Sequence, residues 1–231
     1  MKRIAALVLT LVLVFAMVSC NTFDPAKKSE GVMTYDEYAA ANLDAAVVIE
    51  AFVQAKQSWW DNKATIYLQD PNGGYFVYEM TCSKEDYAKL TVGTKIKVTG
   101  FKTEYKGEIE VDSGATFEII DDGTWVATPT DVTNLLGKDE LIDKQNMLVS
   151  FTDMTVKSVS YKGEERGDDI YVTFTKNGAD YDFCVERYLT DPDTEVYKAV
   201  EALKAGDVVD VEGFLYWYNG PNTHITKVTL K

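Results

Sequence analysis

Histidine and cysteine are scarce in this sequence, which holds one histidine and three cysteines among 231 residues. Zinc sites, reactive thiols and histidine acid–base pairs need these side chains in groups, so such chemistry has few candidate residues here. The sequence also lacks a Gly-x-Ser-x-Gly motif, a Walker loop and a His-Glu-x-x-His motif. We therefore expect no catalytic residue, no cofactor and no enzymatic activity.

Basic residues are few relative to acidic ones: 23 Lys and Arg face 37 Asp and Glu, for a net charge of −14. Without Lys2 and Arg3 of the leader described below, 21 basic residues remain and the net charge is −16. Proteins held mainly by phosphates gain affinity from counterions released at Lys and Arg contacts, so this charge opposes such binding. The contents of 46% hydrophobic and 26% charged residues are typical of a soluble folded protein and argue against a disordered or collagen-like chain.

The long apolar run of the sequence, Ile4 to Val18, follows a basic start and is typical of a secretory signal, too short for a comfortable membrane span. It ends in Met17-Val18-Ser19-Cys20, which resembles the lipobox of bacterial lipoproteins, with Met where Leu is commonest. The resemblance implies that residues 1–20 are a signal peptide and that Cys20 is lipidated. Its acyl chains, such as palmitate, would anchor the protein to a membrane outside the cytoplasm. The alternative is cleavage nearby by a different signal peptidase, with Cys20 an incidental thiol.

Residues 21–33 carry little apolar content, and we expect a flexible tether there. The two other cysteines, Cys82 and Cys184, would lie in an oxidising compartment, so they could form one disulfide. Each ends an alternating apolar run in which a small hydrophobic side chain fits, and we favour two separate buried thiols.

An internal repeat appears when the chain is shifted against itself by 113 positions. Eight positions then match without gaps between residues 90–107 and 203–220, and seven of them are identical. The matches include Gly100 with Gly213, each inside an alternating run typical of a strand with one buried face. Glycine within a strand indicates a sharp bend, by which a short sheet coils into a barrel.

Both halves repeat one order of elements: three strands, a helix and two strands. In the first half we expect strands at 47–55, 64–69, 75–80, 95–103 and from 108 toward 119, with the helix at 83–90. In the second half the strands are expected at 148–159, 170–175, 181–185, 208–216 and 224–230, with the helix at 194–203. This is the order of the OB-fold, a five-stranded Greek-key barrel. A nine- or ten-stranded sandwich would not account for the repeated helix.

The sequence therefore predicts a mainly β protein of two tandem OB-fold barrels, each with a short helix between strands three and four. We place the first barrel at 34–123, a linker at 124–144 and the second barrel at 145–231. A helix at 35–43 precedes the first barrel, opened by a capping box of Thr34 and Glu37, and one helical turn is expected at 140–143 in the linker.

The run from Thr65 to Asp70 with Gly73-Gly74-Tyr75, followed by residues 93–100, resembles the OB-fold domains of bacterial secreted endonucleases and of many bacterial lipoproteins. The second half resembles them more loosely, since Thr173-Phe174-Thr175 stands where Leu-Gln-Asp is expected. The resemblance implies an accessory nucleic-acid-binding module. The chain has no room for the separate nuclease domain.

Aromatic and basic side chains supply the candidate ligand site. Two aromatic groups fall in the loops by which OB-folds hold oligonucleotides and oligosaccharides, namely Trp59 and Trp60, and Tyr216, Trp217 and Tyr218. Lys56, Lys63, Lys102 and Lys106 would form the basic rim of the first barrel. The rings could stack on bases or sugars, or they could close the barrel ends and pack the two domains together.

His224 stands alone, without a second histidine or cysteine near it in the sequence, so we expect no zinc site. The acidic pairs Asp121-Asp122, Asp168-Asp169 and Asp191-Pro192-Asp193 lack the spacing of a calcium loop, and we expect solvated turns rather than a metal site.

The sequence thus predicts a membrane-anchored, extracytoplasmic, non-catalytic binding lipoprotein. Single-stranded nucleic acid is favoured by the resemblance and opposed by the charge. Oligosaccharide and a protein partner of the cell envelope remain the alternatives.

Overall fold

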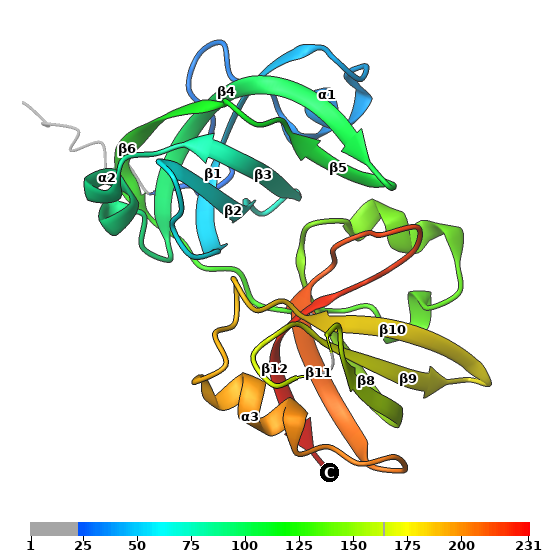
Figure 1. The fold of residues 1–231 in the computed structure, drawn as a ribbon. Coiled ribbons are helices and arrows are strands. Elements are labelled where there is room, and N and C mark those ends of the chain that lie inside the picture. The colour runs from blue at the N-terminus through cyan, green and yellow to red at the C-terminus, as the bar shows by residue number, and fades with distance from the viewer. Residues whose placement is uncertain (1–22, 164) are drawn as a thin grey trace, which may run out of the picture.

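The computed structural model describes residues 23–163 and 165–231, so the signal peptide and Cys20 lie outside the described residues. Within the described residues the strands form two sheets, and each sheet closes on itself as a barrel (Figure 1). The two barrels follow one another along the chain and meet along one side of each. The protein is therefore mainly β, as the sequence predicts.

The first barrel has the strand order of an OB-fold. Its elements are β1 (Ala46–Lys56), β2 (Lys63–Gln69), β3 (Gly74–Thr81), α2 (Lys84–Lys89), β4 (Thr94–Tyr105), β5 (Glu108–Val111) and β6 (Thr116–Thr124). The order β1-β2-β3-β5-β4 closes through an antiparallel pairing of β1 with β4. The single fifth strand expected from Glu108 is instead divided into β5 and β6, because residues 112–115 form a turn in which Gly114 has φ +89°.

The second barrel repeats this order. Its elements are β8 (Leu148–Tyr161), β9 (Ile170–Lys176), β10 (Ala179–Val185), α3 (Glu195–Glu201), β11 (Val208–Phe214) and β12 (His224–Leu230). The order β8-β9-β10-β12-β11 closes through β11 and β8. Between the barrels, β7 (Thr130–Asp131) pairs with β8, and two 3₁₀ turns follow at Thr133–Leu135 and Asp139–Lys144.

The glycines of the repeat occupy matching places in the two barrels. Gly93 and Gly206 have φ values of +88° and +95°, a left-handed conformation that favours glycine. Each donates its N–H to the first strand of its barrel, to the carbonyls of Val53 and Val156, at 2.8 Å in both cases. The turn that leads from the helix into the fourth strand is therefore built in the same way twice.

Gly100 and Gly213 also correspond, because each pairs with a valine of the first strand, Val47 and Val149. A Cβ on Gly100 would lie 2.6 Å from the Val111 side chain, and a Cβ on Gly213 would lie 2.3 Å from a backbone oxygen of the neighbouring strand. Both glycines therefore allow the fourth strand to approach the fifth closely.

The helices begin where the sequence predicts. The capping box of Thr34 and Glu37 is present at α1 (Tyr35–Ala40), which ends three residues before the expected Leu43. Ser83 and Thr194 cap α2 and α3 by accepting backbone N–H groups.

Each barrel encloses its own apolar core, and a third small cluster of Tyr67, Phe76 and Phe214 lies between the barrels. Cys82 and Cys184 are free and buried, which confirms the expectation of two separate thiols. Burial raises the pKa of the Cys82 thiol to about 11, so it stays protonated at neutral pH.

Part of the segment expected to be a flexible tether lies against the first barrel. Lys28 is nearly buried and binds the Asp70 carboxylate and the Glu50 carbonyl, and Met33 donates its N–H to Val48 at 2.9 Å. The Lys27 carbonyl accepts from the buried ammonium of Lys95 at 3.0 Å. Residues 27–33 are therefore bonded to the barrel.

Candidate interdomain binding groove

The barrels meet through the β2–β3 face of the first barrel, the face by which OB-folds ordinarily hold ligands. Tyr67 of β2 stacks on Phe214 of β11 with ring centroids 4.3 Å apart and an interplanar angle of 10°. Phe76 of β3 meets Tyr216 edge-on at 5.4 Å. The second barrel therefore covers part of this face, and a ligand can use only the part that remains open.

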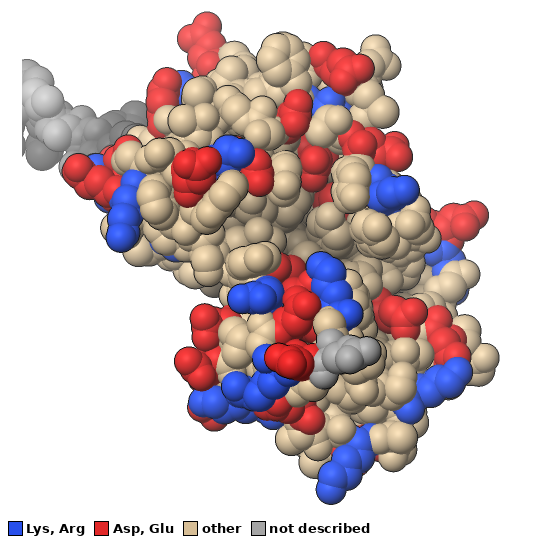
Figure 2. All heavy atoms as spheres, viewed as in Figure 1, with Lys and Arg blue, Asp and Glu red and all other residues tan. Residues whose placement is uncertain are grey.

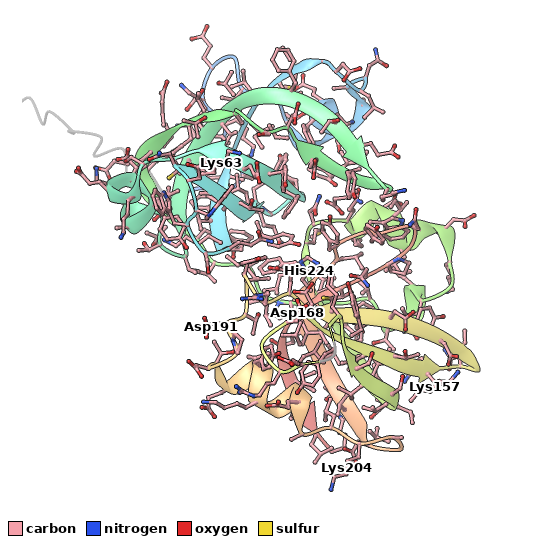
Figure 3. All side chains as sticks on the ribbon, in the orientation of Figure 1. Lys63, Lys157, Asp168, Asp191, Lys204 and His224 are labelled. Atoms are coloured by element: carbon pink, nitrogen blue, oxygen red, sulfur yellow. The ribbon has the colours of Figure 1, made fainter. Side chains whose placement is uncertain are left out.

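A buried histidine lies at the centre of this junction, where Figure 3 labels His224 between the two barrels. Its Nδ1 is 2.9 Å from the hydroxyl of Tyr67, and its ring stacks on Tyr216 at 4.4 Å. Burial lowers the pKa of His224 to about 3, so the ring is neutral at physiological pH. His224 is thus a packed polar residue of the interface.

Backbone and side-chain hydrogen bonds fix one barrel against the other. Gln69 accepts the N–H of Leu148 at 2.7 Å, and Asn146 donates to the carbonyl of Ile109 at 3.0 Å. The carboxylate of Glu108, at the start of β5, accepts the N–H of Trp217 at 2.8 Å. Burial raises the pKa of Glu108 well above its usual range. These hydrogen bonds between named residues therefore join the two barrels at the junction.

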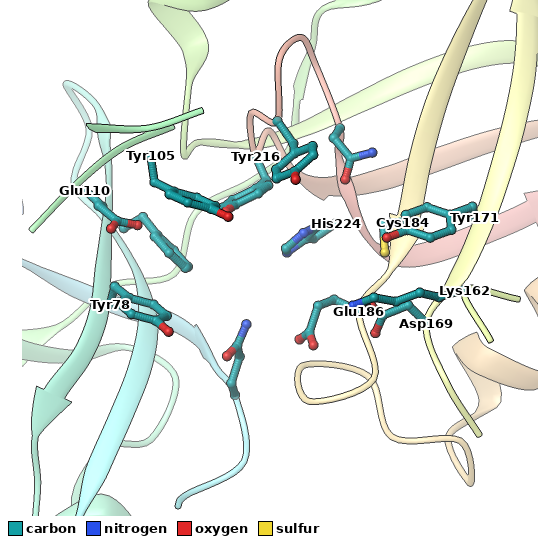
Figure 4. A pocket seen from close by; sticks show the side chains of 14 residues that line it. Tyr78, Tyr105, Glu110, Lys162, Asp169, Tyr171, Cys184, Glu186, Tyr216 and His224 are labelled. Carbon is teal, nitrogen blue, oxygen red and sulfur yellow. Dashed lines mark hydrogen bonds and ion pairs between the residues drawn. The ribbon is translucent and has the colours of Figure 1, made fainter. Parts of the chain in front are cut away.

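A cavity of about 620 Å³ opens beside this junction, between the two barrels (Figure 4). One wall comes from β3, β4 and β5 of the first barrel and carries Tyr78, Tyr105 and Glu110. The other wall comes from the second barrel. Its lining groups include Lys162, Asp169, Tyr171, Glu186, Tyr216, Tyr218, Asn222 and His224. The volume lies within the ~300–1,000 Å³ usual for small-molecule sites.

The charged groups of this cavity are mostly acidic. Burial raises the pKa values of Glu110 and Glu186, on opposite walls, to about 7 each. Asp169 forms an ion pair with Lys162 at 3.1 Å. Figure 2 shows charged side chains of both signs gathered beside the hollow between the barrels, with no continuous basic patch on the face in view.

A second cavity of about 510 Å³ adjoins the first and shares Gln57 and Tyr78 with it. Its lining includes Trp59, Trp60 and Lys63 of the first barrel and Tyr188 of the second. The two cavities together are called the interdomain groove below. It is lined by aromatic rings and amides along its length.

The structure brings part of both predicted aromatic groups to the groove. Trp60 is exposed, whereas Trp59 is half-buried and donates its indole N–H to the carbonyl of Cys82 at 2.9 Å. Tyr216 and Tyr218 line the larger cavity, and Trp217 packs at the junction, where a Cβ on Gly107 would lie 2.7 Å from its ring. Some of these rings therefore pack the two domains together and others line the groove, and stacking on bases or sugars stays a prediction.

The predicted basic rim is not assembled. Lys63 lines the groove but is paired with Glu79 at 2.7 Å, and Lys56 donates to the carbonyl of Tyr87. Lys106 is exposed, and its carbonyl accepts the N–H of Asn219 at 2.7 Å.

The structure places Lys102 outside the interdomain groove. Lys102 is 5% exposed, and its ammonium donates to the carbonyls of Tyr38, Ala39 and Ala41 at the end of α1. Its charge therefore stabilises the end of α1 and does not contribute to the groove.

The groove residues that sequence reasoning missed include Tyr78, Tyr105 and Glu110. Tyr105 was visible as a repeat partner of Tyr218, and the two ring centroids lie 6.2 Å apart where the barrels meet. Tyr78 and Glu110 lie on β3 and β5, whose outward faces could have been singled out from the OB-fold order alone.

Within residues 23–163 and 165–231, no group of three or more His, Cys, Asp or Glu side chains is placed to hold a metal ion. In the same residues, no helix has the length and apolar content needed to cross a membrane.

No protein-family model and no curated protein matches the sequence. Solved structures do resemble it, including the Ifi202 HINa domain in complex with 20-base-pair duplex DNA, at 12% identity and a TM-score of 0.37 over 81% of this chain and 98% of that one. A murine DNA-binding protein bound to duplex DNA is similar at 12% identity and a TM-score of 0.36, over 80% and 90% of the two chains. A replication protein A heterotrimer bound to single-stranded DNA is similar at 13% identity and a TM-score of 0.32, over 72% and 43%.

Proposed function

We propose that this protein is a non-catalytic binding protein, tethered to a membrane through Cys20, that holds an oligosaccharide in the interdomain groove. The observation that carries the proposal is the groove itself, in which rings from both barrels face a cavity with amide and carboxyl groups. Tyr78, Tyr105 and Tyr218 are each about half exposed, so their faces are open to a ligand. Sugar rings stack on such faces. Amides can donate hydrogen bonds to sugar hydroxyls or accept them, and carboxylates can accept them.

The charge of the groove decides between ligand classes. Glu110, Asp169 and Glu186 outnumber Lys162 in the larger cavity, and Lys162 and Lys63 are already paired with carboxylates. A phosphate backbone would meet these carboxylates with few free cations to offset the repulsion. An uncharged oligosaccharide meets no such penalty.

Single-stranded nucleic acid is the second candidate, favoured by the succession of Trp60, Tyr78 and Tyr105 along the groove. Stacking of one base on an aromatic ring is worth about 1–3 kcal/mol, and it does not depend on sequence. Such binding would be weak, because stacking alone would have to supply its free energy.

The test is a calorimetric titration of the mature soluble chain with cellohexaose, maltohexaose, chitohexaose and a twelve-nucleotide deoxythymidine strand, at 50 and 300 mM salt. We expect at least one hexasaccharide to bind with little dependence on salt. Tyr105→Ala should weaken that binding at least tenfold, because it removes a stacking face. Phe101→Ala, which removes an exposed ring of the same strand β4 outside the groove, should change it less than twofold.

Binding of the oligonucleotide alone, with affinity that falls steeply with salt, would transfer the assignment to nucleic acid. Binding of neither ligand would contradict both assignments and leave a protein partner as the remaining hypothesis.

The anchoring part of the proposal has its own test. Cys20→Ala should abolish incorporation of radiolabelled palmitate and release the protein from the membrane fraction. Unchanged fractionation of this variant would show that the cysteine is not the anchor.

A further inference from the structure

Glu110 is a carboxylate in an unusual position on the first-barrel wall of the groove. It is 7% exposed and lines the larger cavity. Within the part of the chain that the structure describes, no hydrogen-bond donor or cation contacts its side chain. The pKa of Glu110 is raised by burial and by the like charge of Asp112. The carboxyl oxygens keep contact with the cavity, so a ligand there can supply the partner that the described residues do not.

Aromatic rings stand around this carboxyl group. Phe76 is the direct neighbour of Glu110 in the pairing of β3 with β5. Tyr216 packs on Phe76, and Tyr78, Tyr105, Glu110 and Tyr216 line the same cavity. Figure 4 shows Glu110 with Tyr78 and Tyr105 on one side of the cavity, and Glu186 and Asp169 across from them.

This combination is specific in its chemistry. The faces of aromatic rings carry negative potential and attract cations, and quaternary ammonium groups are held in proteins by several such rings at once. A carboxylate at the same place adds a full negative charge in a medium that screens poorly. An anion or a neutral hydroxyl would gain far less from these neighbours than a cation.

We propose that the Glu110 carboxylate, with the rings of Phe76, Tyr78, Tyr105 and Tyr216, forms a subsite for an organic ammonium group. The subsite rests on the proposed function in that it occupies the same groove, and it adds that the ligand carries a positive charge. An amine-bearing sugar would satisfy both proposals.

Other charged groups face this subsite, and the sign of each determines whether it attracts or repels a bound cation. Glu108 and Asp112 flank Glu110 on its own chain segment, and Lys162, Asp169 and Glu186 face it from the second barrel. Lys162 is neutralised by its pair with Asp169, so the field at the subsite favours a cation.

The probe for this subsite is choline, which is charged at every pH, compared with 3,3-dimethyl-1-butanol, which has the same shape without the charge. We expect choline to bind the mature soluble chain in a nuclear magnetic resonance titration, with shifts at Tyr105 and Tyr216. The neutral isostere should bind at least tenfold more weakly. Glu110→Gln should weaken choline binding at least tenfold and leave the affinity for the neutral isostere unchanged.

A charge-matched control is Glu104→Gln, on the exposed side of the neighbouring strand β4. It removes the same charge outside the cavity, and it should change choline affinity less than twofold. Choline affinity should also rise between pH 5.5 and pH 8.5, because the pKa of Glu110 is about 7. Most of this rise should be lost in Glu110→Gln, and the remainder comes from Glu186 on the opposite wall, whose pKa is also about 7.

Equal affinities for choline and its isostere, or equal losses in Glu110→Gln and Glu104→Gln, would overturn the subsite. If hexasaccharide binding persists in that case, the proposed function stands without it. If choline binds as expected and no hexasaccharide does, the subsite stands and the oligosaccharide assignment fails.

Discussion

The two barrels carry the same residues at matching positions of the repeat but use them differently. Phe101 of the first barrel is 57% exposed, whereas its partner Phe214 in the second is 2% exposed and stacks on Tyr67 of the other barrel. Tyr105 and Tyr218 correspond as well, and their rings pack at a tilt with centroids 6.2 Å apart. The repeated fold places each ring at the same position of its barrel. The way in which the barrels dock determines which ring is buried in the interface and which stays exposed.

Charge is distributed differently in the two barrels too. The first contains buried ion pairs, Lys28 with Asp70 and Lys95 with Glu50. The ion pairs described for the second barrel include at least one well-exposed partner each, as in Lys157 with Asp180. Removing one member of a buried pair leaves the other without its partner, while exposed pairs are worth little. The first barrel should therefore depend on specific charges, and the second should not.

Phe214→Ala tests the comparison of the matching phenylalanines and should have the largest effect on stability. The change removes a fully packed ring from the junction, and large-to-small changes of this kind cost about 3–5 kcal/mol. We expect a loss of about 4 kcal/mol in the free energy of unfolding, measured by urea denaturation.

Phe101→Ala is its matched control, at the same position of the other barrel. Since that ring is exposed, the expected change is below about 0.5 kcal/mol. Similar losses in the two variants would mean that the packing of Phe214 at the junction adds nothing to the stability of the protein.

The charge comparison is tested by Lys28→Ala. Asp70 would keep three donors, the backbone N–H groups of Asn72 and Gly73 and the hydroxyl of Tyr75, but would lose its cation. We expect a loss of about 3 kcal/mol in the free energy of unfolding. Lys157→Ala in the second barrel, labelled in Figure 3, should cost less than about 1 kcal/mol. A small loss at Lys28 would show that residues 27–33 add little to the first barrel.

Local signals carried the fold prediction well. The strands, the caps at Thr34, Ser83 and Thr194 and the repeated glycines depend on neighbours in sequence, and they predicted both OB-fold barrels. The division of the last strand of the first barrel into β5 and β6 was missed, since Asp112-Ser113-Gly114 reads equally as a turn or as a bulge within one strand.

The site was predicted less completely, because it depends on how two barrels dock. Nothing near Lys102 in sequence indicates that its ammonium reaches the end of α1, more than 60 residues earlier in the chain. The groove itself needs walls from β3 and β5 of one barrel and from the 215–223 loop of the other, and periodicity does not predict such packing. The aromatic loops were found because OB-folds concentrate their contacts there.

The smallest expected effect concerns His224, which belongs to the junction and not to either barrel core alone. Its pKa is about 3 in the folded protein and near 6.5 when unfolded, so below pH 6.5 the unfolded chain binds the extra proton. The stability that depends on the neutral ring is therefore complete above pH 6.5 and is lost progressively as the pH falls toward 3.

Between pH 8 and pH 5 this histidine should cost the protein about 2 kcal/mol, since each pH unit below the unfolded pKa costs about 1.4 kcal/mol. His224→Gln keeps a polar partner for Tyr67 but does not titrate, and every other group is common to both proteins. The difference in unfolding free energy between wild type and His224→Gln, measured at pH 5, 6.5 and 8, isolates the histidine. We expect wild type to lose about 2 kcal/mol relative to the variant on going from pH 8 to pH 5, with most of the change below pH 6.5. A pH-independent difference would mean that the ring is protonated in place at the junction, and that the barrels are held together without a neutral histidine.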